Sequence, residues 1–307
     1  MYKGGNYIWH NGKVLNWEDA KVHVLSHALH YGSSVFEGIR LYNTPDGPKI
    51  FRLTDHIERL YNSAKIYRMQ IPFSDSELVN GCKQIIRENK LENGAYIRPI
   101  AFRGYGEIGL APKDDHQIDV SIAAWEWGTY LGDDALKNGV EVCVSSWQRV
   151  APNTIPTMAK AGGNYLSSTL ISTEAKRLGF DEGIALSTDG KVSEGAGENL
   201  FMVKNDILFT PPASAGILTG ITRDTVIELS KNLGITVKEE GINRESLYLA
   251  DEMFFTGTAA EITPIRSIDR IDIRDGKRGP ITEKLQERFF GLFNGNTEDS
   301  NNWLESI

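Results

Sequence analysis

The stretch TMAKAGGNYLSS, residues 157–168, places one lysine between two alanines and directly before a Gly-Gly pair. No carboxylate stands within several residues of Lys160 on either side, so the sequence offers it no neighbouring ion-pair partner. A lysine that is sheltered from water more readily gives up its proton, and its neutral amine can form a Schiff base with a carbonyl compound. Most lysines are exposed, so a surface lysine beside a turn is the ordinary alternative.

The composition of the chain is that of a soluble globular protein. Its 307 residues are enough for two domains, and 40% are hydrophobic, enough for a normal core. The net charge is -8 and no Lys/Arg-rich run occurs, so neither nucleic acid nor a membrane is an expected partner. Only Cys82 and Cys143 are present, too few for a disulfide framework. The sequence has no signal-like start and no apolar run of about 20 residues. We therefore expect a cytoplasmic protein.

Turn residues predict a series of hairpins. The turns are expected at Asn11-Gly12, Pro45-Asp46-Gly47, Asp189-Gly190 and Asn205-Asp206. Further strands are expected within residues 95–104, 119–127, 141–147 and 251–265. Helices are expected after Thr54, after the capping box of Ser74 and Glu77, over 166–179, from Thr222 to Leu233, and over 281–293. The tail NGNTEDSNNW, residues 294–303, is expected to be solvated.

Strands and helices occur in both halves of the chain without the strict alternation of a doubly wound parallel sheet. The sequence therefore predicts a mixed α/β (α+β) protein of two domains. The segment GTYLGDDALKNG, residues 128–139, carries a glycine at each end and charge between, as linkers do. We expect a small N-terminal domain over residues 1–130, an interdomain loop over 131–139 and a large C-terminal domain over 140–307.

Pyridoxal phosphate is one carbonyl compound that such a lysine could bind, and it makes further demands. A carboxylate must keep its ring nitrogen protonated, and its phosphate needs backbone N–H groups at a helix start. The second half offers Glu194 in GKVSEGAGENLF (190–201), a loop opening a helix in GILTGITRDTVIEL (216–229), and a turn in TGTAAEITP (256–264). Taken singly, each is more often a plain hairpin, an N-cap or a sheet corner.

Three histidines in HVLSHALHYG, residues 23–32, present a different possibility. His23, His27 and His30 recur at spacings of four and three, and three imidazoles could hold zinc if a helix put them on one face. No nearby carboxylate or thiol assists, and the glycine and serines that follow argue against a long helix. We expect no metal here.

Taken together, the motifs AKAGGNYL, VSEGAGENLF, ITRD and TGTAAEITP, in this order, resemble those of the bacterial branched-chain amino acid aminotransferases. HALHYGSSVFEGIR and AYIRP in the first half resemble the same family of pyridoxal phosphate enzymes, which has fold type IV. The likeness runs from YIWHNG near the start to FFGLF near the end. It implies a smaller N-terminal α/β sandwich domain and a larger C-terminal α/β pseudo-barrel domain, with the active site at their interface beneath the mobile linker.

The resemblance also implies which residues hold pyridoxal 5'-phosphate. Lys160 matches the catalytic lysine that binds the cofactor covalently, Glu194 the carboxylate facing the ring nitrogen, and Tyr165 the tyrosine at the ring's phenolic oxygen. The remaining implied cofactor contacts are Leu218 and the phosphate-binding residues Arg59, Ile221, Thr222 and Thr258.

The implied substrate residues fall into three sets. Tyr96 and the turn Gly257, Thr258 and Ala259 match the group that holds the substrate α-carboxylate. Arg98, Tyr130 and Tyr31 of the partner subunit match the set that accepts the side-chain carboxylate of glutamate. Phe36, Gly38, Leu110 and Trp127 match the apolar walls of the side-chain pocket.

The implied reaction moves an amino group between L-leucine, L-isoleucine or L-valine and 2-oxoglutarate, giving branched-chain 2-oxo acids and L-glutamate. The implied assembly is a homo-oligomer, a dimer with shared sites or a hexamer. The alternatives within the fold type are a D-amino acid aminotransferase and an aminodeoxychorismate lyase, and the Tyr96–Arg98 pair and the full-length likeness argue against both. A non-catalytic protein that kept the fold is a further alternative, against which stands the complete set of chemical residues.

Overall fold

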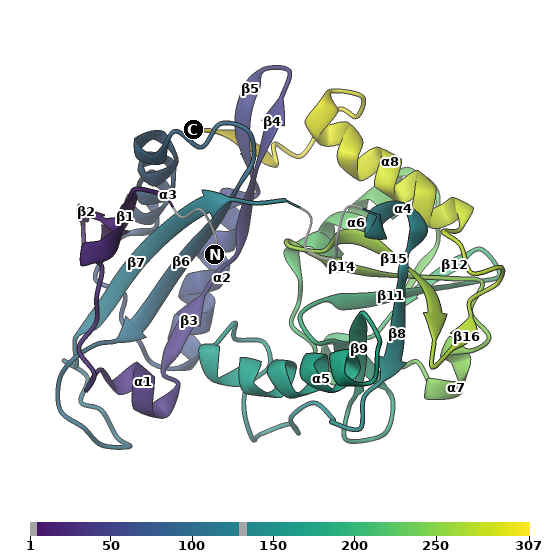
Figure 1. Ribbon diagram of the computed structural model, residues 1–307, viewed down its shortest axis with the longest axis horizontal. Helices are drawn as coiled ribbons and strands as arrows, with labels where there is room; N and C mark the ends of the chain where they lie inside the picture. The colour runs from purple at the N-terminus through teal and green to yellow at the C-terminus, as the bar shows by residue number, and fades with distance from the viewer. Residues whose placement is uncertain (1–4, 129–133) are drawn as a thin grey trace. The chain divides into compact units, whose positions relative to one another are not determined.

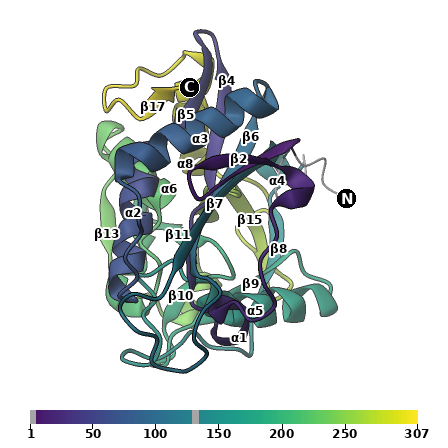
Figure 2. The same cartoon turned by 90° about the vertical axis from the view of Figure 1, so that its left-hand side faces the viewer.

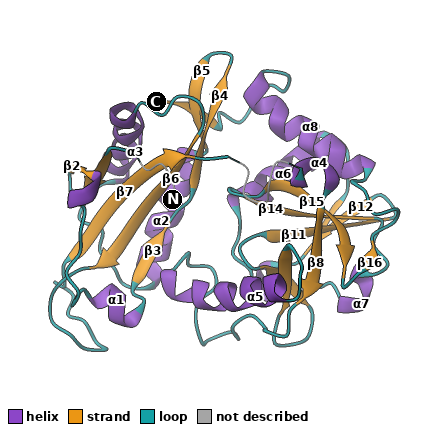
Figure 3. Cartoon of the chain, viewed as in Figure 1, coloured by secondary structure: helices purple, strands orange, loops and turns teal. Residues whose placement is uncertain are grey.

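The computed structural model describes residues 5–128 and 134–307, which form two compact units. The first unit comprises the chain up to Trp127 together with Ala159–Gly163 and Phe293–Ile307, and the second comprises Gly128–Met158 and Asn164–Leu292. Each unit has a sheet of its own with helices packed on it (Figures 1 and 3), so the mixed α/β class is confirmed. Tyr130 and residues 131–133 of the expected loop lie outside the described residues, and the rest of that loop contains α4 (Ala135–Asn138).

The described part of the first unit contains an eight-stranded sheet with the strand order β17-β5-β4-β6-β7-β1-β2, and β3 pairs with β6. Its pairs are all antiparallel. The strands are β1 (Tyr7–His10), β2 (Lys13–Asn16), β3 (Ser34–Phe36), β4 (Ile39–Thr44), β5 (Gly47–Phe51), β6 (Ala95–Arg103), β7 (Ile118–Glu126) and β17 (Leu304–Ser306). The hairpin expected at Asn11-Gly12 is confirmed, since both turn residues have the positive φ that a tight two-residue loop requires.

Two helices, α2 (Leu53–Ile66) and α3 (Asp75–Asn89), pack against this sheet, as Figure 2 shows. Their apolar faces are buried, with Leu60 and Ile85 fully enclosed, and they form a core with the inward-facing residues of β4, β6 and β7. The capping box of Ser74 and Glu77 at the start of α3 is confirmed. A short helix, α1 (His27–Tyr31), and a 3-10 turn, η1 (Trp17–Asp19), complete this unit.

Two expectations for the first unit were wrong, and both concern the C-terminal tail. Helix α2 begins at Leu53 with Arg52 as its N-cap, not at Thr54, whose N–H instead donates to Glu305 Oε1 at 2.7 Å. The tail is not solvated throughout, because Trp303 is buried and its carbonyl accepts a 2.7 Å hydrogen bond from Arg52 N–H. Strand β17 then pairs with β5. A polar tail can therefore close a sheet edge by backbone pairing, which its composition does not reveal.

The described part of the second unit contains a nine-stranded sheet with the order β10-β9-β8-β15-β14-β11-β12-β13, and β16 pairs with β15. Parallel pairs join β8 to β9, β8 to β15 and β12 to β13, and the other pairs are antiparallel. The strands are β8 (Val140–Val144), β9 (Glu182–Leu186), β10 (Val192–Gly195), β11 (Asn199–Lys204), β12 (Ile207–Thr210), β13 (Val237–Glu239), β14 (Glu252–Gly257), β15 (Glu261–Ile268) and β16 (Ile271–Asp272).

Three helices agree with the expected ones within a few residues: α5 (Tyr165–Arg177), α6 (Ile221–Asn232) and α8 (Pro280–Asn294). The short helix α7 (Arg244–Leu247) and the 3-10 turns η2 (Gly162–Asn164) and η3 (Ala213–Ala215) were not expected. Gly179 ends the α5 segment with a positive φ, as expected for a residue just past a helix. Within the described ranges, no helix combines the length and the apolar character that crossing a membrane requires.

Candidate active site

Lys160 is held by its backbone within the first unit. Its N–H donates to Ser63 Oγ on α2 at 3.0 Å, and its carbonyl accepts from Phe36 N–H on β3 at 3.0 Å. The next residue, Ala161, forms a β-bridge with Val35. The lysine segment is thus joined to β3 by one β-bridge and one hydrogen bond, and Lys160 Nζ lies 5.0 Å from the centre of the Phe36 ring.

The small residues around Lys160 have a structural reason in these contacts. Ala159 and Ala161 are 1% and 2% exposed and belong to the core of the first unit. Gly162 follows, and a Cβ built on it would lie 2.4 Å from Ser34 Oγ, closer than any real contact. Larger side chains at these positions would push the lysine segment off β3, so the alanines and the glycine fix where the amine emerges.

Arg59, expected at the cofactor phosphate, is fixed by a buried carboxylate. Glu37 accepts from Arg59 Nε at 2.7 Å through Oε1 and from Arg59 Nη2 at 2.8 Å through Oε2. The same Oε2 lies 2.7 Å from His56 Nδ1, and both Glu37 and His56 are buried. This bidentate pairing sets the plane of the guanidinium, as a single point contact would not.

The charges in this group offset one another. Burial alone would raise the pKa of Glu37, but the charge and hydrogen bonds of Arg59, and then those of His56, outweigh it and hold the pKa well below its usual range. Burial lowers the pKa of His56, which the neighbouring Glu37 opposes only in part. Glu37 is therefore ionised and His56 neutral at pH 7, and Arg59 carries the balancing charge.

Arg98 and the aromatic rings of Phe36, Tyr96 and Trp127 form a second group in the first unit. Tyr96 and Arg98 stand two residues apart on β6 and so face the same side of the sheet. The guanidinium carbon of Arg98 lies 4.8 Å from the ring centre of Phe36 and 5.3 Å from that of Tyr96, whose ring is 4.9 Å from Trp127. Gly38 lies against the hydroxyl of Tyr96, where an added Cβ would come within 1.8 Å of the oxygen. The structure thus brings the expected residues Phe36, Gly38, Tyr96, Arg98 and Trp127 together.

Glu194, expected at the ring nitrogen, is a buried carboxylate of the second unit with several donors. It is 4% exposed, and Oε2 accepts from Asn199 Nδ2 and from Leu218 N–H, each at 3.1 Å. Oε1 forms an ion pair with Arg149, which also donates to Ser168 Oγ at 3.2 Å. These donors compensate the cost of burying the charge and leave the carboxylate in a single orientation.

Asn199 connects Glu194 to the loop that begins α6. Its Nδ2 also donates to the carbonyl of Leu218 at 2.8 Å. Two residues further on, Gly220 is the N-cap of α6 and supplies no side-chain cap to the first turn, where Ile221 and Thr222 are buried. Backbone N–H groups at a helix start attract anions, so this turn has the character expected of a phosphate site.

The other expected cofactor and substrate residues of the second unit stand at the ends of elements. Gly257 is the last residue of β14, and Thr258 and Ala259 form the turn to β15. Tyr165 is the first residue of α5. All four are partly buried, so a ligand could still reach them. That these residues and the lysine group serve one active site stays a prediction.

Two expected substrate residues lie at the surface of the first unit. Tyr31, at the end of α1, is 42% exposed, and Leu110, in the loop between β6 and β7, is 88% exposed. The histidines near Tyr31 do not converge. His23 precedes the helix, His27 contacts Gly109 and Ser33, and His30 contacts Val24. No group of three potential metal ligands occurs within residues 5–128 and 134–307.

Sequence reasoning missed five residues that position the site: Glu37, His56, Ser63, Arg149 and Asn199. Glu37 stands between two expected pocket residues in FEGIR, and Asn199 follows directly after GAGE, so their motifs carried a signal. His56 stands three residues before Arg59 and shares its helix face. Arg149 stands 45 residues from Glu194 and has no local signal.

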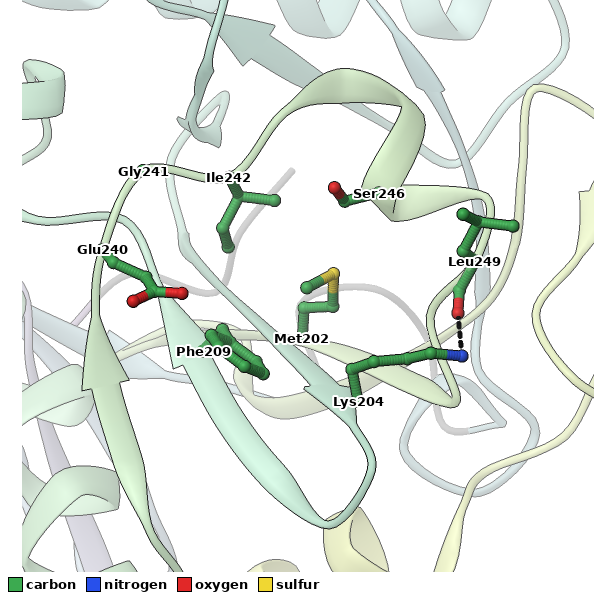
Figure 4. Close-up of a pocket in the computed structure, with 8 residues that line it drawn as sticks. All are labelled: Met202, Lys204, Phe209, Glu240, Gly241, Ile242, Ser246 and Leu249. Atoms are coloured by element: carbon green, nitrogen blue, oxygen red, sulfur yellow. Dashed lines mark hydrogen bonds between the residues drawn. The ribbon is translucent and has the colours of Figure 1, made fainter.

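A separate pocket of about 280 Å³ opens in the second unit (Figure 4). Its lining consists of Met202, Lys204, Phe209, Glu240, Gly241, Ile242, Ser246 and Leu249, none of which is an expected site residue. Lys204 at its edge donates to the carbonyl of Leu249 at 2.6 Å and pairs with Asp251. The pocket gathers no convergent set of polar groups, and we assign it no chemistry.

Comparison with known proteins agrees with the geometry. The family model for amino-transferase class IV matches residues 34–268. The branched-chain-amino-acid aminotransferase of Escherichia coli (strain K12) is 57% identical over 305 residues, 99% of this chain and 98% of that protein. A crystal structure of the E. coli enzyme has a TM-score of 0.97 at 57% identity, covering 98% of this chain and 99% of that one.

A third relative has a ligand. The structure of the T.th. branched-chain amino acid aminotransferase complexed with N-(5'-phosphopyridoxyl)-L-glutamate has a TM-score of 0.93 at 44% identity and covers 99% of both chains. The chain therefore belongs to the class IV aminotransferases, which use pyridoxal phosphate, and within them to the branched-chain amino acid aminotransferase family.

The described residues fit that cofactor within each unit. The first unit holds a lysine on a fixed backbone and an arginine oriented by Glu37, and the second holds a buried carboxylate beside a helix whose N-cap, Gly220, has no side chain. An aldehyde requires the amine, a phosphate requires the arginine and the helix start, and a protonated pyridine nitrogen requires the carboxylate.

Proposed function

We propose that the enzyme transfers the amino group between L-leucine, L-isoleucine or L-valine and 2-oxoglutarate, giving branched-chain 2-oxo acids and L-glutamate. The setting would be branched-chain amino acid synthesis or breakdown in the cytoplasm, where buried free thiols such as Cys82 and Cys143 are stable. The observation that carries the proposal is the group around Arg98, which places a fixed cation among aromatic rings. The phosphopyridoxyl-glutamate complex of the T.th. relative supports glutamate as one of the two substrates.

In this proposal Lys160 carries the proton transfers. Pyridoxal phosphate, when bound, supplies a carbonyl group and an electron-accepting ring. The amine of Lys160 removes the proton from the Cα of the amino acid and delivers a proton in the return step, general acid–base work worth about 10²- to 10⁴-fold in rate. Glu194 holds a proton at the ring nitrogen, and the Arg149, Asn199 and Leu218 donors hold Glu194 in place.

Cofactor and α-carboxylate would be bound by the remaining expected residues. Tyr165 binds at the phenolic oxygen, while Leu218, Ile221, Thr222 and Thr258 join Arg59 at the phosphate. Tyr96 and the Gly257–Ala259 turn hold the α-carboxylate. Phe36, Gly38 and Trp127 line the side-chain pocket.

One pocket must accept both an aliphatic side chain and a propionate. The rings of Phe36 and Trp127 suit the first, and the planar fork of Arg98 suits a carboxylate at the pocket edge. Selection among aliphatic side chains is weak, because one methylene in an apolar pocket changes the transition-state binding free energy by only about 1–3 kcal/mol. Leucine, isoleucine and valine should therefore all be substrates.

The assembly is proposed to be a homo-oligomer, a dimer with shared sites or a hexamer built from such dimers. The supporting observation is an apolar surface on the first unit. Around α1 and the loop after β6, eight large hydrophobic side chains are exposed: Val22, Val24, Leu25, Leu29, Tyr31, Tyr105, Ile108 and Leu110. Exposed apolar side chains in such number favour burial against a second chain, which would bring Tyr31 of the partner subunit to the site.

Arg98→Gln tests the assignment of the two substrates. Glutamate and 2-oxoglutarate offer a carboxylate to Arg98, whereas leucine does not, so KM should rise far more for the first two. The loss of a sheltered charge-assisted hydrogen bond costs about 1.5–3 kcal/mol, or roughly 10- to 150-fold. Each half-reaction is followed separately through the cofactor spectrum. Arg98→Lys is the matched control and should rescue little, because a point charge does not reproduce the fork. Equal losses for leucine and glutamate would refute the role.

A further inference from the structure

The loop between β6 and β7 carries Leu110 and is poorly anchored. Residues 104–117 form no helix or strand, and Leu110 is 88% exposed. Inside the loop, Lys113 and Glu107 form an ion pair at 2.8 Å between two exposed side chains, and such pairs contribute little. Within the described chain, one hydrogen bond alone joins residues 107–113 to another element, and it leads to His27.

His27 is buried and makes two hydrogen bonds, one with each ring nitrogen. Nε2 lies 2.8 Å from the carbonyl oxygen of Gly109, and Nδ1 lies 2.7 Å from Ser33 Oγ. A carbonyl oxygen only accepts, so Nε2 carries a proton and donates it to Gly109. The Ser33 hydroxyl holds the other ring nitrogen, and His27 is 3% exposed.

The same ring also touches the helix that carries Tyr31. His27 is the first residue of α1 and Tyr31 is the last, and their ring centres are 4.5 Å apart. The ring of His116, at the far end of the loop, also lies 5.4 Å from the imidazole of His27. One buried side chain therefore contacts α1, Ser33 just before β3, and the loop residue that directly precedes Leu110.

We propose that His27 is a positioning residue that ties the Leu110 loop to α1 and thereby sets the substrate affinity of the site to which Tyr31 and Leu110 contribute. The inference rests on the proposed function, in which Tyr31 reaches the substrate site of the partner subunit and Leu110 is an expected wall of a side-chain pocket. Without the bond from Nε2, the Gly109 carbonyl loses its partner, and residues 107–113 retain no other hydrogen bond to another element within the described chain. The base of the loop stays attached, because Gly104 accepts from His27 N–H and Tyr105 bridges Ser26. His27 touches no reacting atom, so the turnover number should be spared.

Two amide variants separate the two bonds of His27. In His27→Gln the amide nitrogen reaches the place of Nε2 and can still donate to Gly109, while in His27→Asn the amide reaches only the place of Nδ1 and meets Ser33. We expect His27→Asn to speed hydrogen exchange in residues 107–113 and to raise KM for leucine and 2-oxoglutarate roughly 3- to 10-fold, the range for one neutral hydrogen bond. Its kcat should stay within about twofold of the parent's. His27→Gln should resemble the parent in both measurements.

His30→Asn is the matched control, because His30 is an exposed histidine of the same helix that also neighbours Tyr31, with ring centres 6.2 Å apart, but whose hydrogen bond is with the carbonyl of Val24 and not with the loop. It should alter neither exchange nor KM. Unchanged exchange in His27→Asn, or equal losses in His27→Asn and His27→Gln, would overturn the tether. Faster exchange with unchanged KM would overturn its link to substrate affinity. Hydrogen exchange can be measured without turnover. If the enzyme does not convert branched-chain substrates, the proposed function is refuted, but the exchange measurement still tests whether His27 tethers the loop.

Discussion

Replacing Glu37 by glutamine should destabilise the first unit severely, even though the two side chains have nearly the same shape. Glu37 is fully buried and accepts two hydrogen bonds from Arg59 and one from His56. An amide has one oxygen, so its nitrogen must face a donor of Arg59 or His56, and Arg59 loses the negative charge that faces it. Breaking a buried pair by removing one partner costs about 3–5 kcal/mol, and we expect a loss of this size in the free energy of unfolding at pH 7.

Denaturant titration of the cofactor-loaded enzyme, followed by tryptophan fluorescence, measures this loss. Arg59→Gln and the double variant complete a double-mutant cycle, in which the double variant should lose less than the sum of the single variants. Cofactor retention in Glu37→Gln should also weaken, because Arg59 is then no longer held in one plane. A loss below about 1 kcal/mol, or strict additivity in the cycle, would show that the Glu37–Arg59 pair does not carry the stability assigned to it.

The same pair gives a dependence on pH. Arg59, opposing the effect of burial, keeps the folded-state pKa of Glu37 well below its ordinary value of 4.5. Its contribution is therefore complete above that value and is lost as the pH falls through the folded-state pKa. The free energy of unfolding of the parent protein should fall steeply below about pH 4.5. For Glu37→Gln the slope of that free energy against pH should be smaller, by the contribution of one proton taken up on unfolding. Equal slopes in acid would refute the assignment.

Three further variants test Lys160, Glu194 and Glu198, a buried carboxylate four residues after Glu194. Lys160→Ala should still bind cofactor but lose turnover, and borohydride should fix the cofactor of the parent enzyme to the AKAGGNYL peptide; labelling of another lysine would contradict the assignment. Glu194→Gln should slow Cα proton removal in single turnovers while leaving the fold intact, because an amide cannot hold a proton at the ring nitrogen as a carboxylate does. Burial, aided by the charge of Glu182, raises the pKa of Glu198 to about 8. The free energy of unfolding of the parent should therefore fall as the pH rises from about 5 to 8, and that of Glu198→Gln should fall less. Parallel curves of this free energy against pH would refute the raised pKa of Glu198.

The local parts of the fold could be predicted from the sequence because short-range chemistry decides them. Asn11-Gly12 and Asn205-Asp206 stand in tight hairpin turns, and the Ser74–Glu77 capping box starts α3. Local chemistry also made Thr54 a plausible N-cap, but this prediction was wrong. Glu305, 251 positions later in the chain, accepts the N–H of Thr54. Local pattern cannot reveal a partner that reaches a helix only after the chain has folded.

The candidate site shows the same division between residues that do chemistry and residues that hold them. Lys160, Glu194 and Arg98 stand in motifs that together resemble those of a known family, so the sequence indicates them through that resemblance. Their supports are Ser63 for Lys160, Arg149 for Glu194 and Phe36 for Arg98, and two of these stand at separations of 97 and 45 residues. A support needs only to donate, accept or fill space at one point, and many residue types can do that. The sequence pattern around such a residue is correspondingly weak, and its role becomes visible only when the partner's position is known. For this reason His27, which the sequence suggested as a possible metal ligand, is assigned by the structure to the carbonyl of Gly109.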